Sequence, residues 1–355
     1  MLDADVEVDR RDLTVRAALA VAPGERLALF GPSGAGKTTV LEAIAGLVAP
    51  RRARIALGGR LLTSTSPPVT AVPPWHRRVG LLRQEPALFP HLTVAENLRY
   101  ARRAAGRAAR PADVAGVAAA LGIGGLLAAR PAALSGGQAH RVALGRLLLA
   151  PCEALLLDEP YTGLDEGLRR SLTGLVTEVV SDRAIPAILV AHELEQAQAF
   201  ADRLAVIDRG AVLQVGLPGE VVRRPASRRV AELVGYGGFV PVAGAAPGTV
   251  AGVHAQRVVP GARPERGLVI RGVVDACRPA GAVWEIGVRA GPGAGATVTA
   301  RVAEACAAGA EIELTAVDPP LFGPDGAAAG AEVLAGCGAV AGMSGGWPCA
   351  REARK

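Results

Sequence analysis

The sequence predicts an α/β fold that is followed by a small all-β domain. Short apolar runs alternate with amphipathic helical stretches through the first part of the chain, a pattern typical of a mostly parallel sheet covered by helices. A glycine-rich loop joins the apolar run at 26–30 to a helix expected near 37–47. After residue 249 one strand pattern follows another without a helical pattern between them, which indicates the second domain.

The elements of the α/β part follow from hydrophobic periodicity. Residues 5–8 and 13–15 alternate between polar and apolar, and residues 26–30 are continuously apolar, so all three are expected as strands and the last as a buried one. The first expected helix presents four apolar residues on one face: Leu41, Ile44, Ala45 and Leu47. The remaining expected elements are short strands and turns at 50–85, helices across 92–150, strands at 155–157 and 187–190, helices near 165–181 and 193–202, and a strand pair at 203–215.

Changes in composition divide the chain into segments. The α/β domain is expected at 1–235, with a helical subdomain at about 86–150. Pro and Gly become dense after it, so 236–248 is expected to be a linker. The small β domain is expected at 249–322 and a Gly/Ala-rich tail at 323–355.

The choice of basic residue is more informative than the net charge of +6. Of 39 Lys and Arg residues only Lys37 and Lys355 are lysines. A compact ammonium suits a position between phosphates better than a wide planar guanidinium, so Lys37 is a candidate phosphate ligand. The basic residues form no long tract and are not interleaved with aromatic residues, so no nucleic-acid partner is expected.

The cysteines and the apolar segments exclude further classes. The five cysteines are sparse and lack a C-x-x-C pair, which argues against a disulfide framework or zinc site and favours a reducing cytoplasm. Residues 333–350 are uncharged and nearly long enough to span a membrane, but they are rich in Gly and contain Pro348. A flexible tail is expected there, so a transport role would require other chains to cross the membrane.

A phosphate-binding loop is the most specific local signal. The pattern G-x-x-x-x-G-K-[ST] is matched between an expected strand and an expected helix, and Thr39 follows it: Gly31, Pro32, Ser33, Gly34, Ala35, Gly36, Lys37 and Thr38. Loop amides and the helix N-terminus would surround the phosphates. Lys37 would reach the β and γ oxygens, and the Thr38 hydroxyl would coordinate Mg²⁺. By itself this motif indicates only an NTPase or a kinase.

Two acids end the apolar strand at 155–157. Asp158 would hold Mg²⁺ through water, and Glu159 would act as general base towards the attacking water. Considered alone, the pair is equally consistent with two solvated acids at a strand end.

A second motif makes a family recognisable. The string Leu134, Ser135, Gly136, Gly137 and Gln138 resembles the signature motif of ABC ATPases, and it lies just upstream of the acidic strand as in that family. By the same resemblance Gln84 is the glutamine that contacts Mg²⁺, Gly163-Leu164-Asp165 is the D-loop, and His192 is the histidine that contacts the γ-phosphate. The resemblance covers about residues 1–235 and implies the P-loop NTPase fold, with ATP and Mg²⁺ as cofactors.

The resemblance also implies a mechanism and partners. Two copies would pack head to tail, so that Ser135 of one chain and Glu159 of the other share one γ-phosphate. Opening and closing of this dimer would be passed to transmembrane permease subunits at the cytoplasmic face of the cell membrane, and a solute-binding protein would act indirectly.

The combination with a small β domain resembles the importer branch, in which that domain is of the TOBE (OB-like) type. The stretches 77–80, 88–94 and 96–100 resemble the ATPase of molybdate importers, and sulfate, iron and polyamine importers share much of them. Molybdate or a related oxyanion is therefore the expected solute. The β domain would either bind oxyanion or only pack in the dimer.

One departure concerns the nucleotide base. Many relatives carry an aromatic residue before the loop that stacks on adenine, but no Tyr, Trp or Phe precedes Phe30. Arg10, Arg11 or an apolar residue could substitute, which leaves base selectivity open.

Rival classes fit less well. ABC proteins of DNA repair place a long coiled coil between loop and signature, whereas Lys37 and Ser135 are 98 residues apart (135 − 37) without a heptad run. Translation factors of this family carry two ATPase units in one chain, and a P-loop kinase would lack the signature. A non-catalytic regulator is disfavoured because Glu159 is present.

Overall fold

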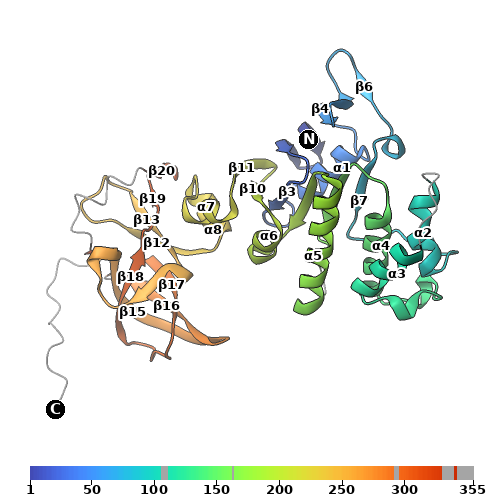
Figure 1. Cartoon of the computed structure of the whole chain (residues 1–355). Coiled ribbons are helices and arrows are strands. Elements are labelled where there is room, and N and C mark those ends of the chain that lie inside the picture. Colours follow the sequence, from blue (N-terminus) through green and yellow to red (C-terminus); the bar gives the residue numbers. More distant parts are fainter. Residues whose placement is uncertain (105–110, 162–163, 292–295, 330–339, 342–355) are drawn as a thin grey trace. The chain divides into compact units, whose positions relative to one another are not determined.

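A computed structural model describes residues 1–104, 111–161, 164–291, 296–329 and 340–341. The chain forms two compact units, Met1–Gly219 and Glu220–Lys355. Figure 1 shows helices and a sheet in the first unit, and mainly strands in the second.

The first unit is built on one sheet of mixed direction. Across the sheet the described strands are β6 (Thr70–Ala71), β5 (Arg60–Ser64), β4 (Arg52–Leu57), β1 (Leu2–Arg10), β2 (Leu13–Val21), β11 (Ala211–Gly216), β10 (Arg203–Asp208), β3 (Arg26–Phe30), β9 (Ala187–Ala191), β8 (Ala154–Asp158) and β7 (Val79–Leu82). From β10 to β7 every pair is parallel, whereas β2, β1, β4, β5 and β6 pair antiparallel. The expected mostly parallel sheet is therefore only half correct, because short hairpin turns such as the one between β1 and β2 force antiparallel pairing.

Seven α-helices begin in the described part of this unit. They are α1 (Lys37–Ala45), α2 (Val94–Ala104), α3 (Pro111–Ala120), α4 (Gly136–Leu149), α5 (Glu166–Arg183), α6 (Leu194–Phe200) and α7 (Pro218–Arg223), with short 3-10 turns at Pro74–His76, Gly124–Leu126 and Pro131–Ala133. Helices α2, α3 and α4 form a group of their own beyond β7 (Figure 1). Helix α1 ends earlier than expected because Gly46 adopts the left-handed conformation, which leaves Leu47 outside it and half exposed.

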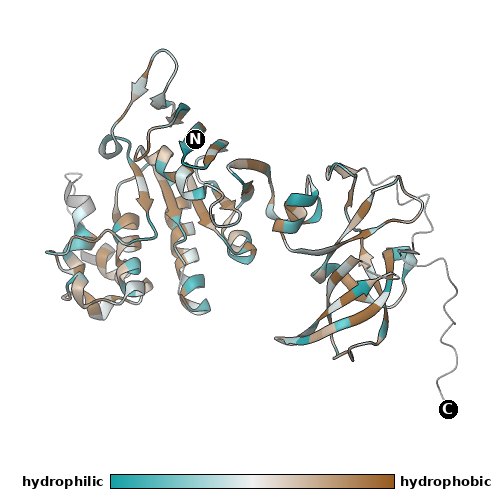
Figure 2. Ribbon diagram, turned by 180° about the vertical axis from the view of Figure 1, so that it is seen from behind, coloured by the Kyte–Doolittle hydropathy of each residue, from teal (hydrophilic) through white to brown (hydrophobic). Residues whose placement is uncertain are grey.

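The core of the first unit lies around its parallel strands. Every residue of β8 and β9 is buried, and four of the five residues of β3 are buried. Figure 2 shows these central strands as hydrophobic along their length. Continuous apolar runs fit parallel strands that helices cover on both faces.

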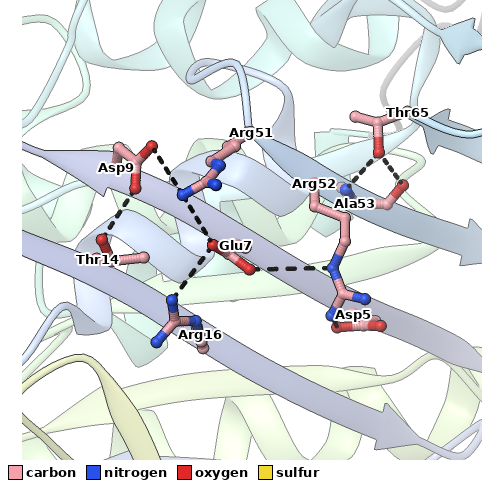
Figure 3. Close-up of polar contacts among 9 residues, drawn as sticks. All are labelled: Asp5, Glu7, Asp9, Thr14, Arg16, Arg51, Arg52, Ala53 and Thr65. Carbon is pink, nitrogen blue, oxygen red and sulfur yellow. Dashed lines mark hydrogen bonds and ion pairs between the residues drawn. The ribbon is translucent and has the colours of Figure 1, made fainter.

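The outer face of β1 is polar and paired. Apolar residues point inward along β1, and the acidic residues between them point outward. Glu7 Oε1 lies 3.4 Å from a terminal guanidinium nitrogen of Arg16 on β2 and 3.4 Å from one of Arg51, the residue before β4 (Figure 3). Glu7 Oε2 lies 4.0 Å from Nε of Arg52 on β4. Cross-strand pairs of opposite charge each contribute a few tenths of a kcal/mol, roughly 0.2–1. This face therefore supports the register of β2, β1 and β4.

The second unit is mainly β. After α8 (Arg228–Leu233), one described sheet contains β12 (Tyr236–Pro241), β13 (Val250–His254), β19 (Leu321–Phe322) and β20 (Ala328–Ala329). The other contains β14 (Val258–Pro260), β18 (Glu311–Val317), β15 (Gly267–Ala280), β16 (Val283–Ala290) and β17 (Ala296–Val302), with β21 (Val340–Ala341) beside β15. Short 3-10 turns occur at Ala255–Arg257 and Pro264–Arg266.

The segment 236–248 is not simply a linker. Its first six residues are strand β12, which pairs with β13, and Val240 and Val242 are buried in the core of the second unit. A Cβ on Gly238 would lie 2.4 Å from the backbone oxygen of Thr297. The glycine thus permits close packing of backbones, which the sequence pattern did not distinguish from flexibility.

Only part of the expected tail can be described. Residues 323–329 include β20, residues 340–341 form β21, and 330–339 and 342–355 lie outside the described residues. Within the described ranges no helix has both the length and the apolar character needed to cross a membrane.

Candidate nucleotide-binding site

The loop between β3 and α1 needs glycine at defined positions. A Cβ on Gly31 would lie 2.0 Å from the backbone oxygen of Ile207. Gly36 has a φ of 101°, which a residue with a side chain rarely adopts. The tight course of the backbone therefore depends on the glycines that the motif specifies.

Lys37 lies inside this loop. Its side chain is buried, and Nζ donates to the backbone oxygens of Gly31, at 2.7 Å, and Pro32, at 2.8 Å. Burial lowers the pKa of Lys37, while the nearby Glu159 and Asp158 carboxylates oppose that shift. An anion in the loop would favour the charged form of the lysine, so the site suits a phosphate electrostatically.

Asp158 and Thr38 form the second part of the site. The Thr38 hydroxyl donates to Asp158 Oδ2 at 2.8 Å. Asp158 Oδ1 is buried and has no hydrogen-bond partner among the described residues, and burial raises the pKa of this carboxyl. A buried carboxylate oxygen without a donor beside a hydroxyl oxygen matches the oxygen ligands of Mg²⁺. The residues present therefore fit the ion.

Glu159 and His192 meet because their strands are neighbours. They follow the carboxyl ends of β8 and β9, which pair in parallel. Glu159 Oε2 lies 3.7 Å from His192 Nδ1, and His192 Nε2 lies 3.7 Å from Glu193 Oε1. Glu159 has a φ of 50°, which is unusual for a residue with a side chain.

A cavity of about 570 Å³ connects most of these groups. Its lining includes eight of the predicted residues: Ser33, Gly34, Gly36, Lys37, Thr38, Thr39, Gln84 and Glu159. The turn between β1 and β2 contributes Arg10, Arg11, Asp12 and Leu13. Asp12 and Leu13 were not singled out in the sequence, since only their place in the hairpin turn brings them to the loop.

The signature string lies elsewhere within the chain. Ser135 caps α4. Its hydroxyl oxygen accepts from the backbone N–H of Gln138, and Gln138 Oε1 accepts from the backbone N–H of Ser135. A Cβ on Gly136 or Gly137 would meet nothing within 4 Å. None of the residues 134–138, all of them described, lines the cavity at the phosphate loop. The motif thus presents an open helix N-terminus.

A second cavity, of about 350 Å³, lies between the signature helix and the acidic strand. It is lined by Gln84, Pro86, Gly136, Gly137, His140 and Glu159. His140 was missed in the sequence. It is 9% exposed, and its Nε2 has no hydrogen-bond partner among the described residues. Burial lowers the pKa of His140, and a hydrogen bond with the Gln84 backbone opposes that shift. It could not be found from sequence because an isolated histidine in a helix is usually a packing residue.

Asp165 has a local structural role. Its side chain caps α5 by accepting from the Leu168 amide at 2.9 Å. It does not line either of the two cavities described above. Gly163 of the same predicted motif lies outside the described residues.

Comparisons with known proteins agree with this arrangement. Residues 15–162 match the family model described as "ABC transporter". The chain is 42% identical over 220 residues to "Fe(3+) ions import ATP-binding protein FbpC 2" of Rhodococcus jostii (strain RHA1), which covers 61% of this chain and 62% of that protein. It is 41% identical over 217 residues to "Molybdenum import ATP-binding protein ModC" of Mesorhizobium japonicum (strain LMG 29417 / CECT 9101 / MAFF 303099), covering 61% and 58%. The chain therefore spans about three fifths of the length of these curated relatives.

A solved structure matches the fold. "Structure of ATP binding subunit of ABC transporter" superposes with a TM-score of 0.55 at 26% sequence identity, over 66% of this chain and 95% of that chain. The predicted fold class, a P-loop NTPase domain of the ABC type, is thereby confirmed.

Proposed function

We propose that this chain, whose first unit has the fold of the ABC ATPases, is the ATP-hydrolysing subunit of an ABC importer. The observation that carries the proposal is that Lys37, Thr38 and Glu159 line one cavity at the end of the parallel sheet, with Asp158 hydrogen-bonded to Thr38. The relatives named above are described as import ATP-binding proteins.

The residues at the loop would bind and orient the triphosphate. Loop amides and the N-terminus of α1 would receive the phosphates, and Lys37 would exchange its two backbone acceptors for phosphate oxygens. Thr38, Asp158 and Gln84 would hold Mg²⁺, which when bound neutralises charge across the phosphates. Glu159 would accept the proton of the attacking water, and His192, 3.7 Å from it, would contact the γ-phosphate.

The signature residues would act on the ATP of a second copy. The N-terminus of α4 is open at Gly136 and Gly137, which supports this role. Within the described chain, the signature residues do not line the cavity at the phosphate loop, which also supports it. Two chains packed head to tail would let each open helix end meet the phosphates held by the other. The Ser135 hydroxyl accepts a capping bond, which leaves its hydrogen able to donate to phosphate.

The solute proposed is molybdate or a related oxyanion, delivered by a solute-binding protein and carried through separate permease subunits at the cytoplasmic face of the membrane. The molybdenum relative and the stretches at 77–80 and 88–94 support this. The iron relative is equally similar, so the solute must be measured. A TOBE-type role for the second unit, as oxyanion binder or as dimer contact, is part of this proposal.

The ATPase is tested with purified Glu159→Gln. The amide cannot accept the proton of the attacking water but fills the same space, so turnover should be lost while ATP is retained in a stable dimer. ATP hydrolysis and light scattering measure both effects. Normal turnover, or an ATP-bound protein that stays monomeric, would contradict the proposal.

The solute is tested by placing Glu159→Gln in the source cell and measuring cellular molybdenum, sulfur and iron. A selective fall in molybdenum supports a molybdate importer. A fall in sulfur or iron instead keeps the importer and replaces the solute. No change in any of the three contradicts uptake of molybdate, sulfate and iron alike.

A further inference from the structure

Two of the cysteines meet in the second unit. Cys277 lies on β15, and Cys306 lies in the connection between β17 and β18, 29 positions further along the chain. The backbone N–H of Cys306 donates to Cys277 Sγ at 3.3 Å. Both side chains pack against the hydrophobic core of this unit and remain partly exposed. The two thiols are therefore neighbours, although no motif in the sequence links them.

A β-bulge turns Cys277 towards the core. Side chains alternate between the two faces of a strand, and the core residues of β15 have even numbers up to Val274, so a regular strand would turn Cys277 outward. The register with β16 shifts between Val274 and Ala276, which inserts one residue and reverses the alternation. Cys277 consequently lies opposite the buried Ile286, and its side chain packs against the core.

Backbone hydrogen bonds fix the connection that carries Cys306. The Val274 N–H donates to the backbone oxygen of Ala310 at 2.9 Å, and the Gly309 N–H donates to the backbone oxygen of Val274 at 2.8 Å. These bonds hold the connection to β15 at a position three residues before Cys277, and they involve neither sulfur. The fold therefore keeps the two cysteines together whether or not they react.

The spacing of the two residues suits a disulfide. With standard bond lengths, the 3.3 Å contact places the two Cα atoms at most about 7 Å apart, and disulfides span Cα separations of about 4.4–6.8 Å. The Cys306 thiol donates to the backbone oxygen of Glu304 at 3.8 Å, a weak bond that rotation of the side chain can break. Formation of the disulfide therefore needs side-chain rotation and little backbone movement.

The other cysteines do not share this setting. Cys152 is the third cysteine among the described residues, and it lies in the first unit. Burial raises the pKa of its thiol, which makes the reactive thiolate scarce. Cys337 and Cys349 lie outside the described residues, so the experiment below includes them as competing partners.

We propose that Cys277 and Cys306 form a redox-active dithiol, which a low-molecular-weight disulfide oxidises to an intramolecular disulfide between β15 and the β17–β18 connection. The thiolate of one cysteine attacks the reagent, forms a mixed disulfide and releases one thiol. The second cysteine then attacks the protein-bound sulfur and releases the other thiol. The protein loses two electrons and two thiol protons, and the reagent is reduced to two thiols.

This modification is independent of the proposed ATPase function. A disulfide that forms only on oxidation is compatible with the reducing compartment that the sequence predicts, where disulfides are mostly transient and redox-sensing. Once formed, it would join two segments of the second unit that are far apart in sequence.

The test maps the disulfide in the full chain. The reduced protein is incubated with oxidised glutathione, free thiols are alkylated, and the chain is cleaved after glutamate. This cleavage releases Cys277 in residues 266–285 and Cys306 in residues 305–311, apart from every other cysteine. Mass spectrometry identifies the linked peptides. The same oxidation in guanidinium measures pairing without the fold. Cys277→Ser, Cys306→Ser and the control Cys152→Ser are compared, and thermal unfolding verifies that each variant is folded.

The expected result is a link between these two peptides that dithiothreitol breaks. It should form at least about tenfold faster in the folded chain than in guanidinium, because the fold raises the effective concentration of one thiol at the other. Cys152→Ser should form the link as the wild type does, whereas Cys277→Ser and Cys306→Ser should stop at a mixed disulfide with glutathione. Alkylated thiols at both positions in the treated wild type would show that the cysteines only pack in the core, and would overturn the inference. So would a link to Cys337 or Cys349 in place of the pair, or equal rates with and without the fold.

Discussion

At the scale of single residues, the site is defined by groups whose burial is unfavourable without a ligand. Lys37 is buried between loop carbonyls, and Asp158 keeps an oxygen without a donor in the described chain. Burial lowers the pKa of the lysine and raises the pKa of the carboxyl, so both charged forms are disfavoured before a ligand arrives. A triphosphate with its cation would compensate both charges at once.

The change Asp158→Asn should separate nucleotide binding from metal dependence. The amide keeps the size of the side chain and its contact with Thr38, but it removes the charge that would hold Mg²⁺. We expect ATP to bind in EDTA as before and the Mg²⁺-dependent hydrolysis to fall about 10- to 100-fold. A magnesium titration of hydrolysis measures the effect. The exposed Asp5→Asn serves as control, and an unaltered magnesium response in Asp158→Asn would refute the assignment.

At the scale of elements, a few buried polar contacts fix how strands and helices meet. Arg77 is 4% exposed and donates to the backbone oxygens of Val72, Ala43 and Ile44 and to the Thr63 hydroxyl. It thereby satisfies the carbonyls at the end of α1 and joins them to the strands beside it. Arg26 and Asp202 connect β3 to the start of β10 in a similar way.

The change Arg77→Met should destabilise the first unit. Methionine fills much of the space but leaves several buried acceptors without a donor, which costs about 2–3 kcal/mol of unfolding free energy. Urea denaturation of the full chain measures the loss. The neighbouring Arg78→Met removes only an exposed ion pair with Glu153 and should change the stability by less than about 0.5 kcal/mol. If the two substitutions lower the unfolding free energy equally, the buried hydrogen bonds of Arg77 do not stabilise the first unit.

The change Asp202→Asn should make stability less dependent on pH. Hydrogen bonds from Arg26 hold the pKa of Asp202 below its ordinary value. A depressed carboxyl pKa stabilises the fold above the unfolded pKa of about 3.9, and that contribution disappears as the pH falls through the folded value. We therefore expect Asp202→Asn to lose about 1 kcal/mol of unfolding free energy at neutral pH; partial exposure of the pair keeps this loss small. In strong acid the variant and the wild type should be equally stable. Urea midpoints between neutral and acidic pH provide the measurement.

At the scale of the whole molecule, the signature residues do not line the cavity at the phosphate loop within the described chain, whereas Gly136 and Gly137 line the second cavity with Gln84 and Glu159. Composite sites of this kind are expected to form between two copies. Loss of either motif should then be corrected by a partner that retains it.

Mixing Lys37→Ala with Ser135→Arg should restore hydrolysis that neither variant shows alone. A mixed dimer holds one site with both motifs intact and one with both altered, so about a quarter of wild-type activity is expected if the chains exchange freely and the sites act independently. Activity of the mixture against each variant alone is the measurement. Mixing Lys37→Ala with Asp158→Asn is the control, since both changes affect the same side of the site. Restoration in that control, or none in the test, would contradict the head-to-tail arrangement.

The sequence by itself determined the elements whose signal is local. The glycines of the loop and the apolar runs of β3, β8 and β9 follow from neighbours along the chain, because backbone conformation and periodicity are short-range properties. The same holds for the fold class, which the alternation of strand and helix predicts.

Only the tertiary structure decided what comes from distant parts of the chain. Sheet direction depends on which strands become neighbours, and so the antiparallel half and the strand β12 in the expected linker were not predicted. The orphaned oxygen of Asp158, the buried His140 and the contact between Cys277 and Cys306 likewise arise between residues far apart in sequence. Burial and hydrogen bonding are properties of the packed chain, and a pattern of residue types does not contain them.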